Sequence, residues 1–462
     1  MEIFYQRHID QEIESLIERI HPPRVCIDND SCRYCSVVKV DSANKHGVLL
    51  DMVQVLTGLE LIISRSYISS DGGWIMDVFH VTDQAGKKLT DQKLELDIQK
   101  ALCTTRSKTP QSQQNVSKEN TVLEMTVLDR PGLLSEISAV LMYSGCHVTS
   151  AMAWTHNDRA ACIIYIEDAT KHGPINDPTR LAQVEEQLEN VVVAHGGRRE
   201  RKSVRMTTVG GGCTHPERRL HQLLYADRDY ESCSACHGDS NGEHKKICDG
   251  THVSISKCED KGYWVVNLRS SDRPKLLFDT VCVLTDMQYV VFHAITTSKS
   301  SIADQEYFIR HIGDNSTLDN ESEREKLILC LISAIERRVS HGLRVDICTE
   351  NSIGLLSNVT RVFRENGFSI SRVEFGTDGE KAVGTFIVTD SSGEEVNPSI
   401  AELVRQECGG TVVIDNKSPH RVSPSIKAET KNNIEANPWF SLGTMLWSQL
   451  ERLSSNFGLI HS

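Results

Sequence analysis

The sequence lacks the marks of membrane and secreted proteins. Its 462 residues contain no run of about 18 apolar residues that could cross a bilayer as a helix. The first residues, Met1-Glu-Ile-Phe-Tyr-Gln-Arg-His8, contain neither the apolar core of a signal peptide nor the Arg- and Ser-rich, acid-poor pattern of a transit peptide. We therefore expect a protein of the cytosol or nucleus.

Positive charge is scarce. The chain has 50 Lys and Arg against 63 Asp and Glu, for a formal net charge of −13. Nucleic-acid affinity comes mainly from Lys and Arg that neutralise phosphates, so this balance argues against a general nucleic-acid surface. The basic run Arg198-Arg-Glu-Arg-Lys202 is the exception. We interpret it as a charged surface strand or loop, with a nuclear-localisation signal as the alternative.

The sequence motifs of common enzyme classes are also absent. There is no G-x-x-x-x-G-K-S/T phosphate loop, no G-x-G-x-x-G after a strand, no H-E-x-x-H and no G-x-S-x-G. Asp227 and Asp229 could pair as two carboxylates, but they follow a short helix beside a linker, and a solvated face is the simpler interpretation. We expect neither an enzyme nor a cofactor.

Cysteine gives no disulfide framework. Fifteen Cys, an odd number, are scattered through the chain, and without a secretion signal they are expected to be reduced thiols. Cys233-Ser-Ala-Cys236-His237 matches the haem-attachment pattern, but that chemistry belongs to exported proteins. Further Cys and His residues nearby would permit a zinc site, yet their spacing matches no familiar zinc module. We expect a Cys-rich linker without a metal.

What the sequence does contain is a repeat. Four times an apolar strand ends in a tight polar turn that restarts as a Leu-rich helix. An aromatic residue in a strand-like run lies 32 or 33 positions beyond the last residue of each turn, which indicates one folded unit repeated four times. The turns are Asp41-Ser-Ala-Asn-Lys-His-Gly47, Asp129-Arg-Pro-Gly132, Asp272-Arg-Pro-Lys275 and Glu350-Asn-Ser-Ile-Gly354, and the aromatic residues are Phe79, Tyr165, Phe308 and Phe386.

Each unit shows the order strand-helix-strand-strand-helix-strand, which predicts an α+β class of four ferredoxin-like units with antiparallel sheets. One sheet face of each unit must be covered, and pairing of units would do this. The longest gap between turns separates units two and three, so we expect unit one to pair with two and unit three with four. The expected domains are an N-terminal helix and lead-in (1–32), unit one (33–106), a linker (107–120), unit two (121–208), a Cys/Gly-rich linker with a short helix (209–260), unit three (261–340), unit four (341–416) and a C-terminal tail with an amphipathic helix (417–462).

Each turn lies where a strand end meets a helix N-terminus. Unsatisfied N–H groups and the positive end of the helix dipole make this place suited to an anion. An α-amino acid fits it, because its carboxylate would take the helix N–H groups and its ammonium would take Asp, Asn or carbonyl oxygens. The alternative is that Asp129 and Asp272 merely cap their helices and that Gly eases packing.

The D-R-P-G-L-L turn within a β-α-β-β-α-β unit resembles the ACT domain, and four copies resemble the plant-type ACT-domain repeat (ACR) proteins. This resemblance covers nearly the whole chain. It implies paired ACT units that bind amino acids at their interfaces, without the catalytic domains that precede similar units in bacterial uridylyltransferase. Three other segments are typical of the ACR group: Pro22-Pro-Arg-Val-Cys-Ile-Asp-Asn-Asp-Ser31, Ser66-Tyr-Ile-Ser-Ser-Asp-Gly-Gly-Trp74, and Glu217-Arg-Arg-Leu-His-Gln-Leu-Leu-Tyr-Ala-Asp-Arg-Asp-Tyr-Glu231.

Only unit two has the intact turn, so we expect the best single ligand site there. Unit three has Lys275 where the family turn has Gly, which removes close approach or selects an anion. Unit one lacks the Arg-Pro pair, and unit four has Glu350 for Asp and Ile353 for Pro. The ligand-binding residues that we expect are Asp41, Asn44, Gly47, Asp129, Arg130, Gly132, Leu133, Asp272, Asn351 and Gly354, with no metal ligand.

These features predict a non-enzymatic regulatory protein that senses free amino acids or nitrogen status and acts on a protein partner or by self-association. Two alternatives remain open: an RRM-like nucleic-acid-binding protein, because the RRM shares this strand order, and a pure protein-interaction scaffold. RRM recognition needs exposed sheet aromatics of the R-G-F-G-F-V-x-F type, which Met76-Asp-Val-Phe-His-Val81 and its counterparts lack. The amphipathic tail helix, with Leu442 to Leu453, is expected to pack on a sheet face or a partner.

Overall fold

The computed structural model supports a description of most of the chain. The helices expected near the N-terminus and in the C-terminal tail, and the Cys233-Ser-Ala-Cys236-His237 segment, lie outside the described residues. No helix within the described part is long and apolar enough to cross a membrane. The described residues are 23–71, 73–104, 120–194, 204–209, 215–232, 250–258, 262–299, 301–313, 316–339, 342–390 and 400–415.

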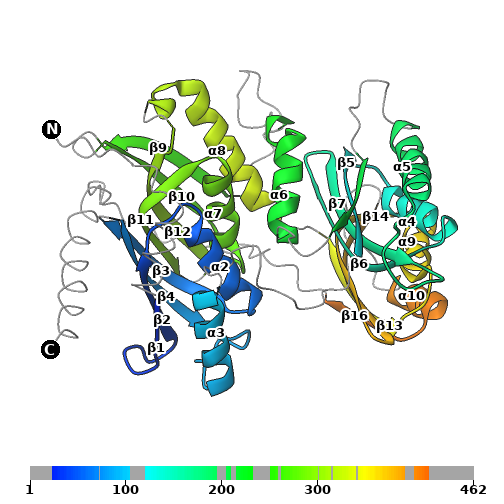
Figure 1. The fold of residues 1–462 in the computed structure, drawn as a ribbon, viewed down its shortest axis with the longest axis horizontal. Coiled ribbons are helices and arrows are strands. Elements are labelled where there is room, and N and C mark those ends of the chain that lie inside the picture. The colour runs from blue at the N-terminus through cyan, green and yellow to red at the C-terminus, as the bar shows by residue number, and fades with distance from the viewer. Residues whose placement is uncertain are drawn as a thin grey trace, which may run out of the picture. The chain divides into compact units, whose positions relative to one another are not determined.

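The described strands form two antiparallel eight-stranded sheets (Figure 1). In spatial order, sheet A contains β1 (Arg24–Asp28), β2 (Ser36–Ala43), β4 (Trp74–Thr82), β3 (Ile62–Asp71), β11 (Tyr289–Lys299), β12 (Ile302–His311), β10 (Tyr263–Ser271) and β9 (His252–Cys258). Sheet B contains β16 (Thr411–Asp415), β13 (Leu343–Glu350), β15 (Lys381–Asp390), β14 (Phe368–Asp378), β6 (Cys146–His156), β7 (Arg159–Asp168), β5 (Asn120–Leu128) and β8 (Val204–Val209).

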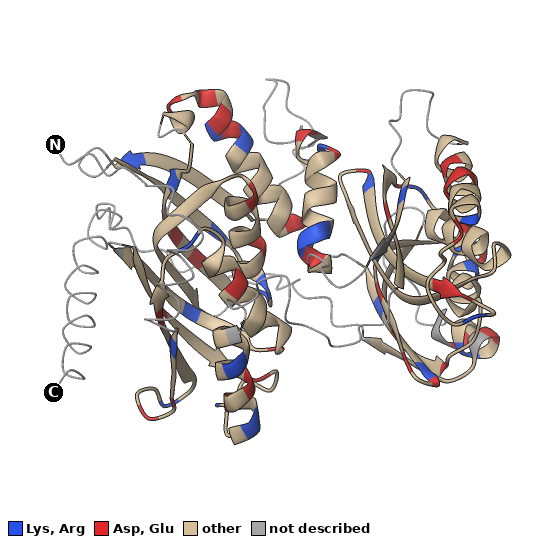
Figure 2. Cartoon of the chain, viewed as in Figure 1, with Lys and Arg blue, Asp and Glu red and all other residues tan. Residues whose placement is uncertain are grey.

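Helices cover one face of each sheet and enclose two separate cores (Figure 1). Their apolar residues recur at helical spacing and face the alternating apolar side chains of the strands, so each core is a sheet–helix layer. Sheet A carries α2 (Val48–Gly58), α3 (Gln92–Thr104), α7 (Leu276–Asp286) and α8 (Glu321–Glu336); sheet B carries α4 (Leu133–Tyr143), α5 (Pro178–Val193), α9 (Leu355–Glu365) and α10 (Ile400–Cys408). The first helix of units one, two and three (α2, α4 and α7) contains an acidic residue but no Lys or Arg, whereas the other five helices carry both charges (Figure 2).

The units pair differently from our expectation. Unit one joins unit three through β3 and β11, where Ser66 lies opposite Thr296, and unit two joins unit four through β6 and β14. The expected pairing of one with two and three with four is therefore wrong. The second strand of each unit lies at the edge of that unit's own sheet, so its free backbone groups can pair with the edge strand of another unit. The length of the linker between two units does not decide which unit becomes the partner.

The fourth strand also differs between units. Units two and four have the expected order, because β8 and β16 follow their second helices and pair antiparallel with β5 and β13. Units one and three instead take β1 and β9 from in front of their first strands. We expected these segments in the lead-in and in the Cys/Gly-rich linker. A preceding strand satisfies the same sheet edge as a following one, because an antiparallel neighbour can be joined by a short loop.

The aromatic landmark of the repeat proves to be two different positions. Phe79 and Phe386, at an offset of 32 residues, are buried in the cores, whereas Tyr165 and Phe308, at 33, lie on the opposite sheet faces. Successive strand residues point to opposite faces, so one residue of difference reverses the side chain. The residue of unit three that corresponds to Phe79 is the buried Tyr307.

Helix α6 (Pro216–Ala226) lies outside this repeat. It packs Leu220 and Leu224 against Val122, Trp154 and Ile163 on the sheet B face away from the four helices of that sheet, and it also contacts α7 of unit three. The short 3-10 turn η1 (Asp229–Ser232) follows it and contacts α8. The single helix α6 thus connects unit two with unit three.

Candidate functional site

The four repeated turns have one backbone geometry. The residue before each first helix adopts a left-handed conformation, with φ of 86° at Gly47, 80° at Gly132, 64° at Lys275 and 80° at Gly354. None of these four helices has a side-chain cap. In the structure the side chains of Asp129 and Asp272 therefore do not cap these helices, contrary to the alternative interpretation.

A shared hydrogen bond fixes which turn residues correspond. The backbone N–H of Asp129 donates to the carbonyl of Asp158 at 2.8 Å, and that of Asp272 donates to Ser301 at 2.8 Å. In units one and four the matching donors are Asn44 and Asn351, each 2.7 Å from its acceptor. Asp41 lies within β2 instead, paired with Met76, and Glu350 ends β13. The turn thus begins with Asp in two units and with Asn in the other two.

The Arg of the D-R-P turn is engaged in a structural contact. Arg130 forms two hydrogen bonds with Glu136, of 2.9 and 2.6 Å, and Arg273 pairs with Asp279 at 2.7 Å. Each Arg also reaches a carbonyl near the end of the second helix of its unit, Val191 or Ile335. Arg130, which we expected at the ligand, therefore ties the turn to its own unit.

The turn of unit two faces unit four and is nearly closed. A cavity of only about 30 Å³ lies between Asp129, Gly132 and Leu133 on one side and Arg364 and Phe368 on the other. A Cβ atom on Gly132 would lie 2.9 Å from Cδ of Arg364, so the stem of this Arg covers the turn. Burial raises the pKa of Asp129 to about 6. The site holds a half-buried carboxylate that no described cation pairs with at close range.

The turn of unit four is closed as well. A Cβ on Gly354 would lie 2.6 Å from Sδ of Met142, and the cavity beside it measures about 10 Å³. In unit one, by contrast, a Cβ atom on Gly47 would meet no described atom within 4 Å other than those of its chain neighbours, and His46 is exposed. Met142 therefore fills the position that a ligand would need in unit four, and the turn of unit one is not covered in this way.

The turn of unit three is different, because it borders a cavity of about 190 Å³ between units one and three. One water needs roughly 10–15 Å³ measured in this way, so the cavity can hold a small organic molecule. Asp272, Lys275 and the start of α7 form one wall, and Thr57 with Leu61 to Ile63 forms the opposite wall. β11 and β12 contribute Thr296 to Ser298, Ala303 and Gln305.

Gln305 is a polar residue of this cavity with an unsatisfied donor. Its side chain is only 4% exposed, and its Oε1 accepts the hydroxyl of Tyr307. Its Nε2 has no hydrogen-bond partner among the residues that the structure describes. A buried amide donor without an acceptor is costly, which makes it a place where a ligand acceptor would be stabilised.

The register of the sheets identifies the same position in every unit. Gln305 lies opposite Leu268, and the corresponding residues are Asp77 opposite Val40, Cys162 opposite Met125 and Gly384 opposite Ile347. The position is thus polar in both units of sheet A and small in both units of sheet B. Neither Gln305 nor Asp77 was among the residues expected from the sequence, because the turn motif does not include them.

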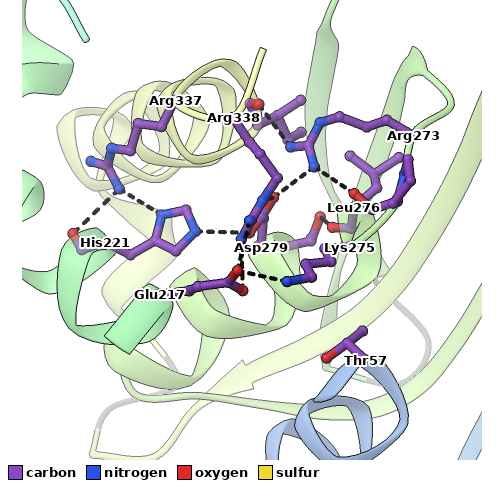
Figure 3. Close-up of polar contacts among 12 residues, drawn as sticks. Thr57, Glu217, His221, Arg273, Lys275, Leu276, Asp279, Arg337 and Arg338 are labelled. Atoms are coloured by element: carbon purple, nitrogen blue, oxygen red, sulfur yellow. Dashed lines mark hydrogen bonds and ion pairs between the residues drawn. The ribbon is translucent and has the colours of Figure 1, made fainter. Parts of the chain in front are cut away.

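Lys275 is the residue that connects this turn to the rest of the molecule. Its Nζ lies 2.6 Å from Oε1 of the buried Glu217, near the start of α6, and Arg338 lies 3.2 Å from the same carboxylate (Figure 3). The two cations more than offset the cost of burial, and they lower the pKa of Glu217 to about 2. The ammonium group of Lys275 is therefore already paired with a carboxylate of this same chain, that of Glu217 in α6.

Beside Glu217 lies a buried ionic cluster centred on Asp279 (Figure 3). Asp279 is fully buried and accepts two hydrogen bonds from Arg338, of 2.8 and 2.7 Å, and one of 2.8 Å from His221 of α6. Burial raises the pKa of this carboxyl, but the nearby guanidinium groups of Arg338 and Arg273 hold it well below its ordinary value. Arg338 also stacks over Trp154 of unit two, 4.7 Å from the ring centre.

Comparisons with known proteins agree with this architecture. Residues 31–109 match the family model of the ACR family N-terminal ACT domain, and residues 343–409 match that of the ACT domain. The chain is 52% identical over 481 aligned positions to ACT domain-containing protein ACR1 of Arabidopsis thaliana, covering 99% of each chain. The chain belongs to the ACR family of ACT domain-containing proteins. The resemblance drawn from the sequence and the α+β fold class are thereby confirmed.

Other relatives show how far the likeness extends. ACT domain-containing protein ACR3 of Arabidopsis thaliana is 47% identical over 428 positions, which cover 90% of this chain and 92% of the relative. The bifunctional uridylyltransferase/uridylyl-removing enzyme of Azospirillum brasilense is 38% identical over 81 residues, or 18% of this chain and 9% of that enzyme. This ACR-family chain therefore shares only a short segment with that enzyme.

Proposed function

We propose that this ACR-family protein is a non-enzymatic regulator that binds a free amino acid in the cavity at the turn of unit three. The observation that carries the proposal is the cavity of about 190 Å³ lined by Gln305, whose amide nitrogen has no partner among the described residues. The Gln305 Nε2 would donate to the ligand carboxylate, together with N–H groups at the start of α7. The carboxylate of Asp272 would take the ligand ammonium.

The ligand would act by holding two units together. Its polar groups would contact unit three, while its side chain would lie against Leu61, Ile62 and Ile63 of unit one. A ligand that binds only the folded pair stabilises it by RT ln(1 + [L]/Kd), about 2.7 kcal/mol at a hundredfold excess over Kd. Lys275 would relay a change at the turn to α6, because it pairs with Glu217. Such a response would suit a sensor of amino-acid or nitrogen status that changes affinity for a protein partner.

The turn of unit two stays a second proposed site that needs an opening movement. Asp129 could meet a ligand ammonium there, and Gly132 permits close approach of a carboxylate to Leu133. The stem of Arg364 would have to leave the turn first, because the present cavity holds about two waters. The turn at Asn351 and Gly354 would require a similar displacement of Met142, whereas no described side chain beyond the chain neighbours of Gly47 covers the turn at Asn44 and Gly47.

The test is calorimetric titration of the full chain with each common amino acid, followed by the variant Gln305→Leu. Leu keeps the approximate size of Gln but removes the donor. Losing a hydrogen bond to a charged group costs about 1.5–3 kcal/mol, so Kd should rise by about 10- to 100-fold. Gln183→Leu is the matched control, because Gln183 is exposed on α5 of unit two and does not line the cavity, and its Kd should be unchanged.

Other outcomes would contradict the proposal. An unchanged Kd in folded Gln305→Leu would move the ligand to another site. Absence of any amino-acid binding, together with tight binding of RNA, would favour the RRM-like alternative, and absence of both would favour the scaffold. Chemical change of a bound amino acid, detected by mass spectrometry after incubation, would indicate an enzyme.

A further inference from the structure

Two cysteines lie in contact in the loop that joins β1 to β2. Cys32 and Cys35 are three residues apart, and their sulfur atoms are 3.1 Å from each other. This separation is only about 1 Å longer than the bond of a disulfide, so formation of that bond needs a small local movement. Neither residue lines the amino-acid cavity, and neither belongs to the repeated turns.

The loop is held firmly on both sides of the pair. Asp28 accepts the backbone N–H groups of Asp30 and Ser31 at 2.9 Å, and it also pairs with Lys39 at 2.9 Å. Asn29 donates to the carbonyl of Leu89 at 3.0 Å and to Glu95 at 2.8 Å, which ties the loop to the segment at α3. The two thiols are therefore kept together by contacts that do not involve the sulfur atoms.

The two thiols have different chemical environments. Cys32 is partly exposed, and the hydrogen bond donated by the Cys35 thiol lowers its pKa. Cys35 is only 7% exposed, and burial raises its pKa to about 11. In thiol–disulfide exchange the exposed thiolate attacks first and a protected neighbouring thiol resolves the mixed disulfide. The environments of Cys32 and Cys35 match these two roles.

We propose that Cys32 and Cys35 form a reversible redox pair that exchanges with small-molecule disulfides of the glutathione type. The Cys32 thiolate attacks one sulfur of glutathione disulfide, forms a mixed disulfide and releases one glutathione thiolate. Cys35 then gives its proton to the released thiolate, attacks the Cys32 sulfur and expels the second glutathione. Two electrons pass from the protein dithiol to glutathione disulfide, which becomes two glutathione molecules. Excess reduced glutathione reverses both steps.

The sequence around the pair gives a direct assay. Trypsin cuts after Arg24, Arg33 and Lys39, so Cys32 and Cys35 fall in separate peptides that only a disulfide can join. Cys26 shares the first peptide, and the test therefore uses the full chain carrying Cys26→Ser. The protein is equilibrated in glutathione buffers of rising oxidised fraction, quenched with acid, alkylated and digested. The joined pair of peptides should appear as the oxidised fraction rises and disappear when reduced glutathione is restored.

Single variants distinguish a redox pair from two unrelated thiols. Cys35→Ser should leave one glutathione on Cys32, because no resolving thiol remains. Cys32→Ser should leave Cys35 unmodified, because its thiol is buried. Absence of the joined peptides at every buffer ratio would overturn the proposal. So would joining of Cys32 to other cysteines as often as to Cys35, or an equal rate of alkylation at both thiols in the reduced protein.

Discussion

Sheets A and B share one spatial arrangement of strands and the same repeated turns, yet the two sheets differ at one interior position of each unit. Sheet A places the polar residues Gln305 and Asp77 there, whereas sheet B places Cys162 and Gly384. The larger cavity, about 190 Å³ against about 30 Å³, belongs to sheet A, although the intact D-R-P-G-L-L turn belongs to sheet B. The turn motif builds the helix start, and the residues opposite the turn decide whether a ligand has room and partners.

The ion pairs of the two turns show a similar contrast. Glu136 and Asp279 occupy the same helix position, and each pairs with the Arg of its turn. The pair in unit two is partly solvated, with 32% of the Glu136 side chain exposed, whereas Asp279 is fully buried between His221 of α6 and Arg338, two residues after α8. Solvation lets water replace a lost partner in unit two, but unit three offers no such replacement.

The largest expected effect on stability comes from removing the acid of each ion pair in turn. Asp279→Ala would leave Arg338 and Arg273 buried without their shared carboxylate, and we expect the free energy of unfolding to fall by about 3–5 kcal/mol. Glu136→Ala removes the matching acid from unit two, where a partly solvated ion pair contributes about 1 kcal/mol to stability. Urea unfolding of both variants beside the wild type measures the difference.

A second pair of variants, with smaller changes, gives a test that does not depend on the Ala variants remaining folded. Asp279→Asn and Glu136→Gln keep the side-chain size and remove only the charge. The Asn variant should still lose clearly more stability than the Gln variant. Equal losses at the two positions would show that Asp279 is not buried among its cations in solution.

The next effect concerns the unpaired acid of sheet B. Burial raises the pKa of folded Asp129 to about 6 from an ordinary value of 3.8, so the folded protein binds this proton more tightly than the unfolded chain. The wild type should therefore lose stability relative to Asp129→Asn as pH rises from about 4 to about 6. At pH 7 the Asn variant should be more stable by about 1–3 kcal/mol.

The two proteins should have nearly the same stability at pH 4, which serves as the internal control. Urea unfolding at half-unit pH steps gives the curve. A difference that does not vary with pH would mean that Asp129 is solvated. An amino acid bound at this turn would reduce the difference at pH 7, because its ammonium would pair with the carboxylate.

A smaller effect is expected from a variant that opens the turn of unit two in sheet B, so that it resembles the turn of unit three in sheet A. Arg364→Ala removes the side chain that covers Gly132, so the turn of unit two would gain room for a ligand. We expect calorimetry to detect a second amino-acid binding event per chain, or at least about a tenfold gain in affinity there, equal to about 1.4 kcal/mol. Arg361→Ala on the same helix is the control, because Arg361 pairs with Glu365 outside the cavity. Unchanged binding in Arg364→Ala would mean that room is not what limits this turn.

The features that could be predicted from the sequence are those that depend on residues close together in the chain. The repeated turns, their helices and the hairpins are local patterns of Gly, Pro and apolar spacing, and the structure contains them. The pairing of units and the origin of β1 and β9 depend on contacts between distant segments, which no local pattern records. Gln305 was missed for the same reason, because its place opposite Leu268 appears only when the register of β10 and β12 is known. Arg364 likewise reaches Gly132 from another unit.

The smallest effect tests the residue that distinguishes unit three from the other turns. Lys275 holds a left-handed conformation, with φ of 64°, which costs a residue with a Cβ roughly 1–2 kcal/mol. Lys275→Gly relieves this strain but frees the unfolded chain by about 0.4–1 kcal/mol and removes the half-exposed pair with Glu217. Glu217 keeps Arg338, so the three changes nearly cancel and stability should stay within about 1 kcal/mol of the wild type.

Lys275→Ala separates these contributions, because it loses the same ion pair and keeps the strain. The Ala variant should be less stable than the Gly variant by about 1 kcal/mol, and urea unfolding of the two resolves such a difference. If Ala and Gly were equally stable, the turn of unit three would not be left-handed in solution, and its likeness to the other three turns would end at the sequence. If Gly were much less stable than the wild type, the contact between Lys275 and Glu217 would be a stronger link between units two and three than its exposure indicates.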